Sequence, residues 1–279
     1  MTAVRFENVR FSYPSGVEAL HGVSFEVPTG QRLAIVGQNG AGKTTLVRHL
    51  NGIFQPTSGS VFVADAATTG RAIAELAASV GYVFQNPDEQ IFASTVIADV
   101  EFGPRNLGCS ADEARSRAMA ALETVGLAAE ADTHPLHLSL SERKRVALAG
   151  VLAMQTPIVV LDEPTTGQDA GGVAMVAGVV GALASAGRTV IAITHDMDFA
   201  AEHFDRVVVM AKGEVLVDGA PATVFGEADA LARAAVEPPQ LFRLAAHLGW
   251  PDRPLTVEGF VTHSNAVEPR WSSLSRPGC

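Results

Sequence analysis

The sequence predicts an α/β fold, and three observations lead to that prediction. Two bare runs of apolar and β-branched residues, 158–161 and 189–194, have polar residues at their ends and suit parallel strands buried on both faces. A short apolar strand at 32–36 precedes a glycine-rich loop and a helix over about 43–50. The first thirty residues alternate like strands, so an antiparallel sheet is expected beside the parallel one.

Composition favours a globular protein that does not bind nucleic acid. Hydrophobic residues make up 47% of the 279 residues and charged residues 18%, which excludes a disordered chain. The formal net charge of -10 argues against a nucleic-acid binder, which usually carries a basic stripe. Cys109 and Cys279 form no C-x-x-C pair, so they are interpreted as inert free thiols.

One long uncharged stretch, residues 170–187, raises the question of a membrane span. It is shorter than the roughly 20 apolar residues that a membrane helix needs, and it is rich in glycine and alanine. We therefore interpret it as a buried or partner-facing helix. Any role at a membrane is then expected to pass through a partner.

The chain divides into strand-rich and helix-rich segments. The amino-terminal strands cover residues 4–6, 9–11 and 23–27. Residues 73–148 are mostly helical, with one strand near 81–84. The remaining elements are a helix at 111–125, strands at 207–210 and 214–217, and helices at 228–235 and 240–248.

The character of the chain changes near residue 226, which predicts two parts. The first, residues 1–225, is expected to contain the parallel core, the antiparallel β subdomain and a helical subdomain at about 88–148. The second, residues 226–279, is expected to be a small helical extension that ends in a loose tail from Ser264.

Residues 37–44 fit the phosphate-loop pattern G-x-x-x-x-G-K-[ST] in full. A chance glycine-rich turn is the alternative, but the strand before the loop and the helix after it are the context that the mechanism requires. Glycines let backbone amides point at phosphates, Lys43 places a cation on the outer phosphates, and the Thr44 hydroxyl can bind Mg²⁺. The predicted nucleotide-binding residues are Gly37, Gln38, Asn39, Gly40, Ala41, Gly42, Lys43, Thr44 and Thr45.

Two carboxylates follow the apolar strand at 158–161. The strand carries Asp162 and Glu163 to the rim of a parallel sheet, where ligands bind. An acid pair after a strand is often a helix cap, but beside a phosphate loop it favours a function. We predict that Asp162 holds Mg²⁺ through water and that Glu163 polarises the attacking water as a general base.

Over about residues 2–225 the order of these motifs resembles the ABC ATPase family. The resemblance implies a P-loop NTPase core that hydrolyses ATP to ADP and phosphate with Mg²⁺, in a dimer that encloses two ATP molecules. It implies that Tyr13 stacks on adenine, with packing on a sheet edge as the alternative. It also implies that Gln85 senses Mg²⁺ and the attacking water, that His195 contacts the γ-phosphate, and that Asp169 lies at the dimer seam.

Residues 83–92 and 99–104 resemble a narrower group, the ATPases of energy-coupling-factor importers, which take up vitamins or transition-metal ions such as cobalt. Residues 238–244 resemble that group's short helical extension, which helps to pair two ATPase subunits. The resemblance implies three partners: a second ABC ATPase subunit, an integral membrane coupling protein and a substrate-binding membrane component. It places the chain on the cytoplasmic face of the cell membrane as a peripheral subunit.

The signature motif departs from the family pattern. The usual Leu-Ser-Gly-Gly-Gln is replaced by Leu138, Ser139, Leu140, Ser141 and Glu142. The resemblance implies that Ser139 binds the γ-phosphate of ATP held by the opposite subunit. Side chains at 140 and 141 hinder the close approach that glycines permit, and Glu142 adds unfavourable negative charge. We expect an intact ATP site on this chain and a weakened signature offered to its partner.

Two rival functions stay open at this point. The altered signature is also compatible with a regulatory ABC module that binds ATP as a switch and hydrolyses it poorly. A small-molecule kinase could use the same phosphate loop. The Asp162–Glu163 pair and His195 argue against a kinase, which needs a second substrate pocket and has no use for a water-polarising glutamate.

Overall fold

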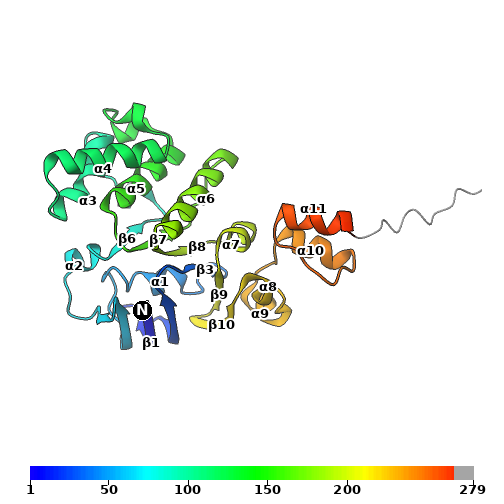
Figure 1. Cartoon of the computed structure of the whole chain (residues 1–279). Coiled ribbons are helices and arrows are strands. Elements are labelled where there is room, and N and C mark those ends of the chain that lie inside the picture. The colour runs from blue at the N-terminus through cyan, green and yellow to red at the C-terminus, as the bar shows by residue number, and fades with distance from the viewer. Residues whose placement is uncertain (267–279) are drawn as a thin grey trace, which may run out of the picture.

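A six-stranded sheet forms the centre of the chain in the computed structural model, which describes residues 1–266 (Figure 1). Five of its strands run parallel, and β10 pairs antiparallel with β9 at one edge. The α/β fold class is therefore confirmed. In order across the sheet, the strands are β10 (Glu214–Gly219), β9 (Arg206–Ala211), β3 (Arg32–Val36), β8 (Thr189–Ile193), β7 (Ile158–Asp162) and β6 (Val80–Val83).

Alternate residues of the central strands face two different cores. Leu161 and Ala192 pack among the helices on one face of the sheet. Val160 and Ile191 face the other way and pack with the apolar residues of the second, antiparallel sheet. Every residue of β7 and β8 is buried, which explains why these strands are continuous apolar runs in the sequence.

The second sheet is antiparallel, as expected from the first thirty residues, and its strand order is β2-β1-β4-β5. The predicted strands at 4–6 and 9–11 are one strand, joined by an irregularity at Asn8, whose φ is 46°. β2 begins before the predicted strand at 23–27, and β4 and β5 have no counterpart among the predictions. The strands are β1 (Thr2–Ser12), β2 (Glu18–Pro28), β4 (Ser58–Val63) and β5 (Ala66–Ala67).

Helix α1 (Lys43–Val47) is shorter than the helix predicted over 43–50. The cause lies in the His49 side chain, because His49 Nδ1 lies 2.8 Å from the carbonyl oxygen of Thr45. That carbonyl would otherwise accept the His49 backbone N–H, which instead donates to Leu46 at 3.2 Å. The side chain therefore competes with the backbone and ends the α-helix early.

Between β6 and β7 the chain forms most of its helical part, which Figure 1 shows on the far side of the central sheet from β1. The predicted helix at 111–125 is present as α4, one residue shorter. Val100, Leu122 and Val146, one from each long helix, are buried in a common core. We propose that this group is the helical subdomain of about 88–148. The helices here and before β6 are α2 (Ile73–Ala77), α3 (Val96–Asn106), α4 (Ala111–Thr124) and α5 (Leu140–Met154).

The uncharged stretch forms α6 (Ala170–Ser185), which is a helix as predicted. Val176, Val180 and Leu183 are buried against the sheet side, whereas Gly178 and Ala182 on another face are exposed. Within residues 1–266, no helix combines the length and the apolar character that crossing a membrane requires.

The carboxyl-terminal part lies beside the edge strands β9 and β10 (Figure 1). Its Leu231 and Phe242 join the same buried core as Phe225, and a division near residue 225 remains our proposal. The prediction of a loose tail from Ser264 is wrong for residues 264–266, which complete α11, and residues 267–279 lie outside the described residues. The helices are α7 (Met197–His203), α8 (Pro221–Val224), α9 (Ala228–Ala234), α10 (Gln240–His247) and α11 (Val257–Ala266).

The extension of α11 past Ser264 has a visible cause. The Trp250 ring stacks on Phe260, with centroids 4.7 Å apart, and on His263, with centroids 4.5 Å apart. Two aromatic contacts three residues apart lie on one helical face, so they stabilise the helix through its last turn.

Candidate nucleotide site

The phosphate loop joins β3 to α1 and turns on glycines. Gly37, Gly40 and Gly42 have φ values of 146°, 80° and 98°, a region that other residues rarely adopt. A Cβ on Gly37 would lie 2.1 Å from the carbonyl oxygen of Met210, and one on Gly42 would lie 2.8 Å from that of Ala19. The loop therefore follows a path that side chains at its two ends would block.

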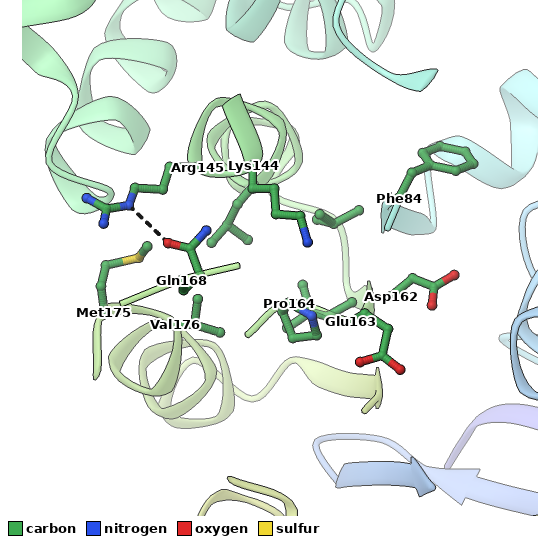
Figure 2. Close-up of a pocket in the computed structure, with 12 residues that line it drawn as sticks. Phe84, Lys144, Arg145, Asp162, Glu163, Pro164, Gln168, Met175 and Val176 are labelled. Atoms are coloured by element: carbon green, nitrogen blue, oxygen red, sulfur yellow. Dashed lines mark hydrogen bonds between the residues drawn. The ribbon is translucent and has the colours of Figure 1, made fainter. Parts of the chain in front are cut away.

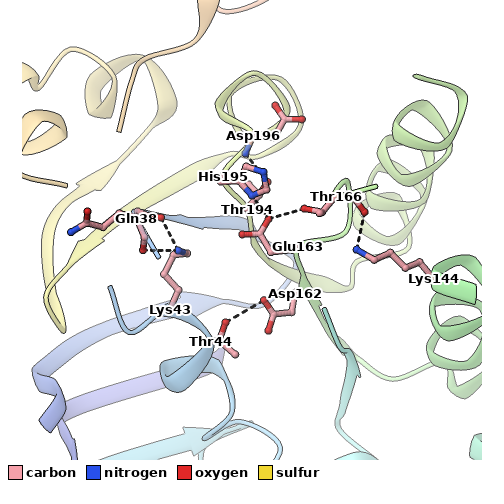
Figure 3. A network of polar contacts seen from close by, with 11 residues as sticks. Gln38, Lys43, Thr44, Lys144, Asp162, Glu163, Thr166, Thr194, His195 and Asp196 are labelled. Carbon is pink, nitrogen blue, oxygen red and sulfur yellow. Dashed lines mark hydrogen bonds and ion pairs between the residues drawn. The ribbon is translucent and has the colours of Figure 1, made fainter. Parts of the chain in front are cut away.

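Lys43 begins α1 and folds back into the curve of the loop (Figure 3). Its Nζ donates to the carbonyl oxygens of Gly37 at 2.7 Å and Gln38 at 3.1 Å. Burial lowers the pKa of Lys43, while the carboxylates of Glu163 and Asp162 act in the opposite direction. The ammonium lies inside the loop and faces the acidic rim, where the outer phosphates of a nucleotide need a cation.

Asp162 ends β7 and is only 1% exposed. Tyr82 OH donates to its Oδ2 at 2.9 Å, and Thr44 Oγ1 donates to its Oδ1 at 3.3 Å. Burial raises the pKa of Asp162, and the two hydrogen bonds oppose that rise. A threonine hydroxyl beside a carboxylate is the kind of oxygen donor set that Mg²⁺ prefers, so these residues fit the ion.

Tyr82 is a site residue that the sequence analysis does not identify. Burial and the charge of Asp162 raise the pKa of Tyr82, so its hydroxyl keeps its proton and donates a hydrogen bond to the carboxylate. In the parallel pairing of β6 with β7, Tyr82 lies opposite Val160, two residues before the acid. Tyr82 could have been found from the sequence by placing the predicted strand near 81–84 beside the predicted strand at 158–161.

Glu163 follows Asp162 with a φ of 53°, an unusual conformation for a residue other than glycine. Its Oε2 lies 2.6 Å from His195 Nδ1 and accepts from Thr166 Oγ1 at 3.4 Å (Figure 3). Glu163 is 6% exposed, whereas the His195 side chain is 65% exposed. The glutamate is held from two sides at the end of β7, and backbone strain of this kind is typical of functional sites.

Two cavities bring most of the predicted site residues together. One, of about 310 Å³, follows the phosphate loop, and the other, of about 570 Å³, extends from Gln38 and His195 to Arg243 of the extension. Gln85 and Glu163 line both cavities, so the predicted glutamine faces the loop. The first cavity is lined by Asn39, Gly40, Ala41, Gly42, Lys43, Thr44, Thr45, Gln85, Glu163 and Ile193.

Tyr13 lines neither cavity and packs beside the helix that follows the loop. Tyr13 OH and Thr45 Oγ1 lie 2.7 Å apart. The Tyr13 ring meets Phe11 and Phe54 edge-on, with centroids 5.0 and 5.7 Å away. These are the packing contacts of the alternative interpretation, and stacking on adenine stays a prediction.

Comparisons with known proteins decide the family. The sequence profile of the ABC transporter family matches residues 20–166. A putative ABC transporter ATP-binding protein of Methanothermobacter marburgensis is 42% identical over 88% of each chain. The chain belongs to the ABC transporter ATPase family.

Other similar proteins carry more specific names. An energy-coupling factor transporter ATP-binding protein of Methanocaldococcus jannaschii is 40% identical to this ABC ATPase over 94% of each chain. Among solved structures, cbiO1 of Clostridium perfringens, part of the ABC transporter complex cbiONQ, has a TM-score of 0.73 at 35% identity, covering 89% of this chain and 99% of its own. A dimeric ATP-binding cassette bound to ADP and phosphate has a TM-score of 0.72 at 28% identity, covering 78% of this chain and 98% of its own.

This ABC ATPase is therefore an ATP-binding subunit of an ABC transporter, and it hydrolyses ATP. ABC ATPases of this type work as dimers with membrane components. The kinase alternative is excluded by the family.

The altered signature of this ABC ATPase forms the start of α5, and Ser139 lines neither cavity of its own chain. The Ser139 hydroxyl and backbone N–H both donate to Glu142 Oε2, at 2.7 and 2.8 Å, and Glu142 N donates back to Ser139 Oγ at 3.3 Å. These hydrogen bonds lower the pKa of Glu142. Glu142 is thus more than the unfavourable charge expected above, because it closes a capping box that its S-x-x-E spacing signals.

Proposed function

We propose that this chain is the ATPase subunit of an energy-coupling-factor importer and that its ATP hydrolysis powers the uptake of a vitamin or a transition-metal ion. The likeness to the Methanocaldococcus jannaschii protein over nearly the whole chain supports the importer type, as does the likeness to cbiO1. The observation that carries the chemistry is the rim of the central sheet, where Glu163 lies beside the phosphate loop and is bonded to His195.

In the proposed mechanism, the phosphate loop binds the nucleotide, and the residues at the carboxyl end of β7 hold the metal ion and activate the water. The loop amides and Lys43 hold the outer phosphates of ATP. Thr44 and Asp162 would hold Mg²⁺, which supplies positive charge to the phosphate oxygens when bound. Tyr82 keeps the Asp162 carboxylate in place through the bond to Oδ2. Gln85, across the cavity, orients the attacking water.

Glu163 accepts a proton from that water, which is the general-base role. Its buried carboxylate lies at the cavity wall, and its bonds to His195 and Thr166 leave it few rotamers. His195 is exposed enough to contact the γ-phosphate while its Nδ1 stays on the glutamate. The pair therefore couples the base to the phosphate that is transferred.

We further propose that the chain is peripheral on the cytoplasmic face of the cell membrane. Its partners are a second ABC ATPase subunit, an integral membrane coupling protein and a substrate-binding membrane component. The surface near residues 85–90 receives the coupling protein. Next to it, Phe92 is 65% exposed and meets the 48% exposed Phe102 edge-on, with centroids 4.7 Å apart, an apolar pair suited to a partner.

Capture from membranes tests this assembly. A tagged chain should co-purify from detergent extracts of its own cells with a second ATPase and a polytopic membrane protein, and Phe92→Asp should lose the membrane protein because it places a charge in the apolar contact. Mass spectrometry of the captured proteins gives the result. Val17→Asp places the same charge at another exposed apolar side chain, in a remote turn, and should capture as the wild type does. Equal capture by both variants would contradict the proposed surface.

The weakened signature predicts unequal ATP sites in a heterodimer. If the partner has an intact signature, the site on this chain's Lys43 and Glu163 is complete, whereas the opposite site must use Ser139 and Leu140. Ser139→Ala should then change the hydrolysis rate less than twofold, and Leu140→Gly should speed the slow site by opening the backbone. The rates are measured in the assembled complex, with the glutamate of one subunit disabled at a time.

The same measurement separates the two candidate functions. Loss of most activity from Glu163→Gln, and little from the partner's equivalent change, supports the asymmetric transporter. Equal losses from both would contradict the asymmetry. A complex that binds ATP but turns it over as slowly as the Glu163→Gln variant would instead support the regulatory module, the alternative suggested by the altered signature at Ser139–Glu142.

A further inference from the structure

The first turns of α5 are bonded to the segment that follows Glu163. Ser141 Oγ donates to Gln168 Oε1 at 2.7 Å, and Gln168 Nε2 donates back to the carbonyl oxygen of Ser141 at 3.3 Å. Arg145, one turn further along α5, donates from Nε to the same Gln168 oxygen at 3.4 Å (Figure 2). One side chain thus spans two segments that are 27 residues apart in the sequence.

The Gln168 side chain fits its position because the residue opposite its amide is a glycine. A Cβ on Gly172 would lie 2.4 Å from Gln168 Oε1, so the glycine at the start of α6 leaves room for the amide. Ser141 stands where the usual signature has its second glycine, and a glycine has no hydroxyl to donate. The departure that weakens the signature therefore also creates a bond within the chain.

A second connection runs from α5 to the glutamate itself. Lys144 Nζ donates to the carbonyl oxygen of Thr166 at 2.8 Å, and Thr166 Oγ1 donates to Glu163 Oε2 at 3.4 Å (Figure 3). Lys144, Asp162 and Glu163 line one cavity, and burial lowers the pKa of Lys144 while the charges of the two carboxylates oppose that fall. Together the two connections hold the segment 163–169 on α5 at Thr166 and at Gln168.

We propose that Ser141 and Gln168 are a positioning pair, which holds the segment 163–169 on α5 and thereby aims Glu163 in this chain's own ATP site. The inference rests on the base role proposed for Glu163. It gives Ser141 a function inside its own subunit, separate from the nucleotide of the partner. A serine in place of the usual glycine at 141 thus weakens the ATP site across the dimer, while its bond to Gln168 stabilises the ATP site on this chain.

A double-mutant cycle tests the pair. The variants Ser141→Gly, Gln168→Leu and the combination are compared in ATP hydrolysis by the assembled complex, with the glutamate of the partner subunit disabled so that only the site on this chain turns over. The kcat and the KM for ATP are measured separately. Each single change should lower kcat about threefold to tenfold, the effect of one lost hydrogen bond on the orientation of the base. KM should stay within about twofold because neither residue contacts the phosphate loop. The double variant should be no slower than the slower single variant, since both changes remove one interaction.

The controls separate positioning from folding. Ser116→Gly, at an exposed position of α4, carries the same helix penalty and should keep the wild-type kcat. Melting temperatures of all variants check that the differences in kcat do not follow stability.

Three results would overturn the pair: losses in kcat that multiply, a Ser141→Gly variant at least as fast as the wild type, or singles with unchanged kcat. Each would show that Ser141 does not act through Gln168. Glu163→Gln, assayed beside them, keeps the two proposals distinct. If Glu163→Gln is inactive and the losses in kcat of the two single variants multiply in the double variant, only the positioning pair is rejected. If Glu163→Gln is active, the general-base role of Glu163 is rejected.

Discussion

Glu163→Gln is expected to bind ATP as the wild type does and to lower kcat about 10²- to 10⁴-fold, the usual contribution of a general base. The amide cannot accept a proton from the attacking water, while the phosphate loop and Lys43 are unchanged. Phosphate release gives kcat, and calorimetric titration gives the affinity for ATP. Because ATP then stays bound, the variant should also shift toward the dimer in size-exclusion chromatography.

Glutamine tests the general-base role specifically, because it removes the basic carboxylate and keeps the shape of the side chain. The amide oxygen can still accept the bond from His195 Nδ1, and the unusual φ of 53° is no harder for glutamine than for glutamate. Glu123→Gln, at an exposed end of α4, makes the same chemical change far from the site and should hydrolyse ATP normally. A Glu163→Gln variant with near wild-type turnover would show that another group is the base.

The local parts of the site could be predicted because their chemistry is contiguous in the sequence. The phosphate loop needs only a strand, eight residues and a helix, and the Asp162–Glu163 pair needs only the end of a buried strand. The resemblance to the ABC ATPases implies that His195 contacts the γ-phosphate, and the structure places its Nδ1 2.6 Å from Glu163 Oε2, at the rim where the parallel strands end. The roles of these residues stay predictions.

Most of the features that the sequence analysis missed are contacts between segments far apart in the chain. Tyr82 meets Asp162 across 80 residues, and only the register of β6 against β7 reveals it. Gln168 meets Ser141 across 27 residues by side-chain shape alone. β4 was missed because Ser58 and Gly59 open it without a strand pattern, and its pairing with β1 decides its conformation.

Two helix ends were also predicted wrongly, because a side-chain contact there competes with the local conformational tendency, and the sequence pattern does not show which of the two is stronger. The helical pattern continues to Leu50, yet the His49 ring takes the carbonyl of Thr45 and ends α1 at Val47. The tail composition after Ser264 favours disorder, but the stacking of His263 on Trp250 carries α11 to Ala266. In both places a single side-chain contact outweighs the local tendency.

Lys43→Ala is expected to raise the Kd for ATP about 10- to 150-fold, which corresponds to the loss of a charge-assisted hydrogen bond. The Nζ position inside the loop, within 3.1 Å of the carbonyl oxygens of Gly37 and Gln38, is where a cation meets the outer phosphates. Alanine also leaves the loop with the negative charges of Asp162 and Glu163 unopposed. Titration calorimetry with ATP and with AMP separates the outer phosphates from the rest of the nucleotide.

AMP lacks those outer phosphates, so its affinity should change much less than that of ATP. Arg233→Ala, on the exposed side of α9, removes one positive charge away from the site and should leave both affinities unchanged. If Lys43→Ala bound ATP with unchanged affinity, the assignment of the phosphate loop would be wrong. If it weakened AMP as strongly as ATP, Lys43 would be supporting the fold of the loop, since a direct contact with the outer phosphates cannot act on a ligand without them.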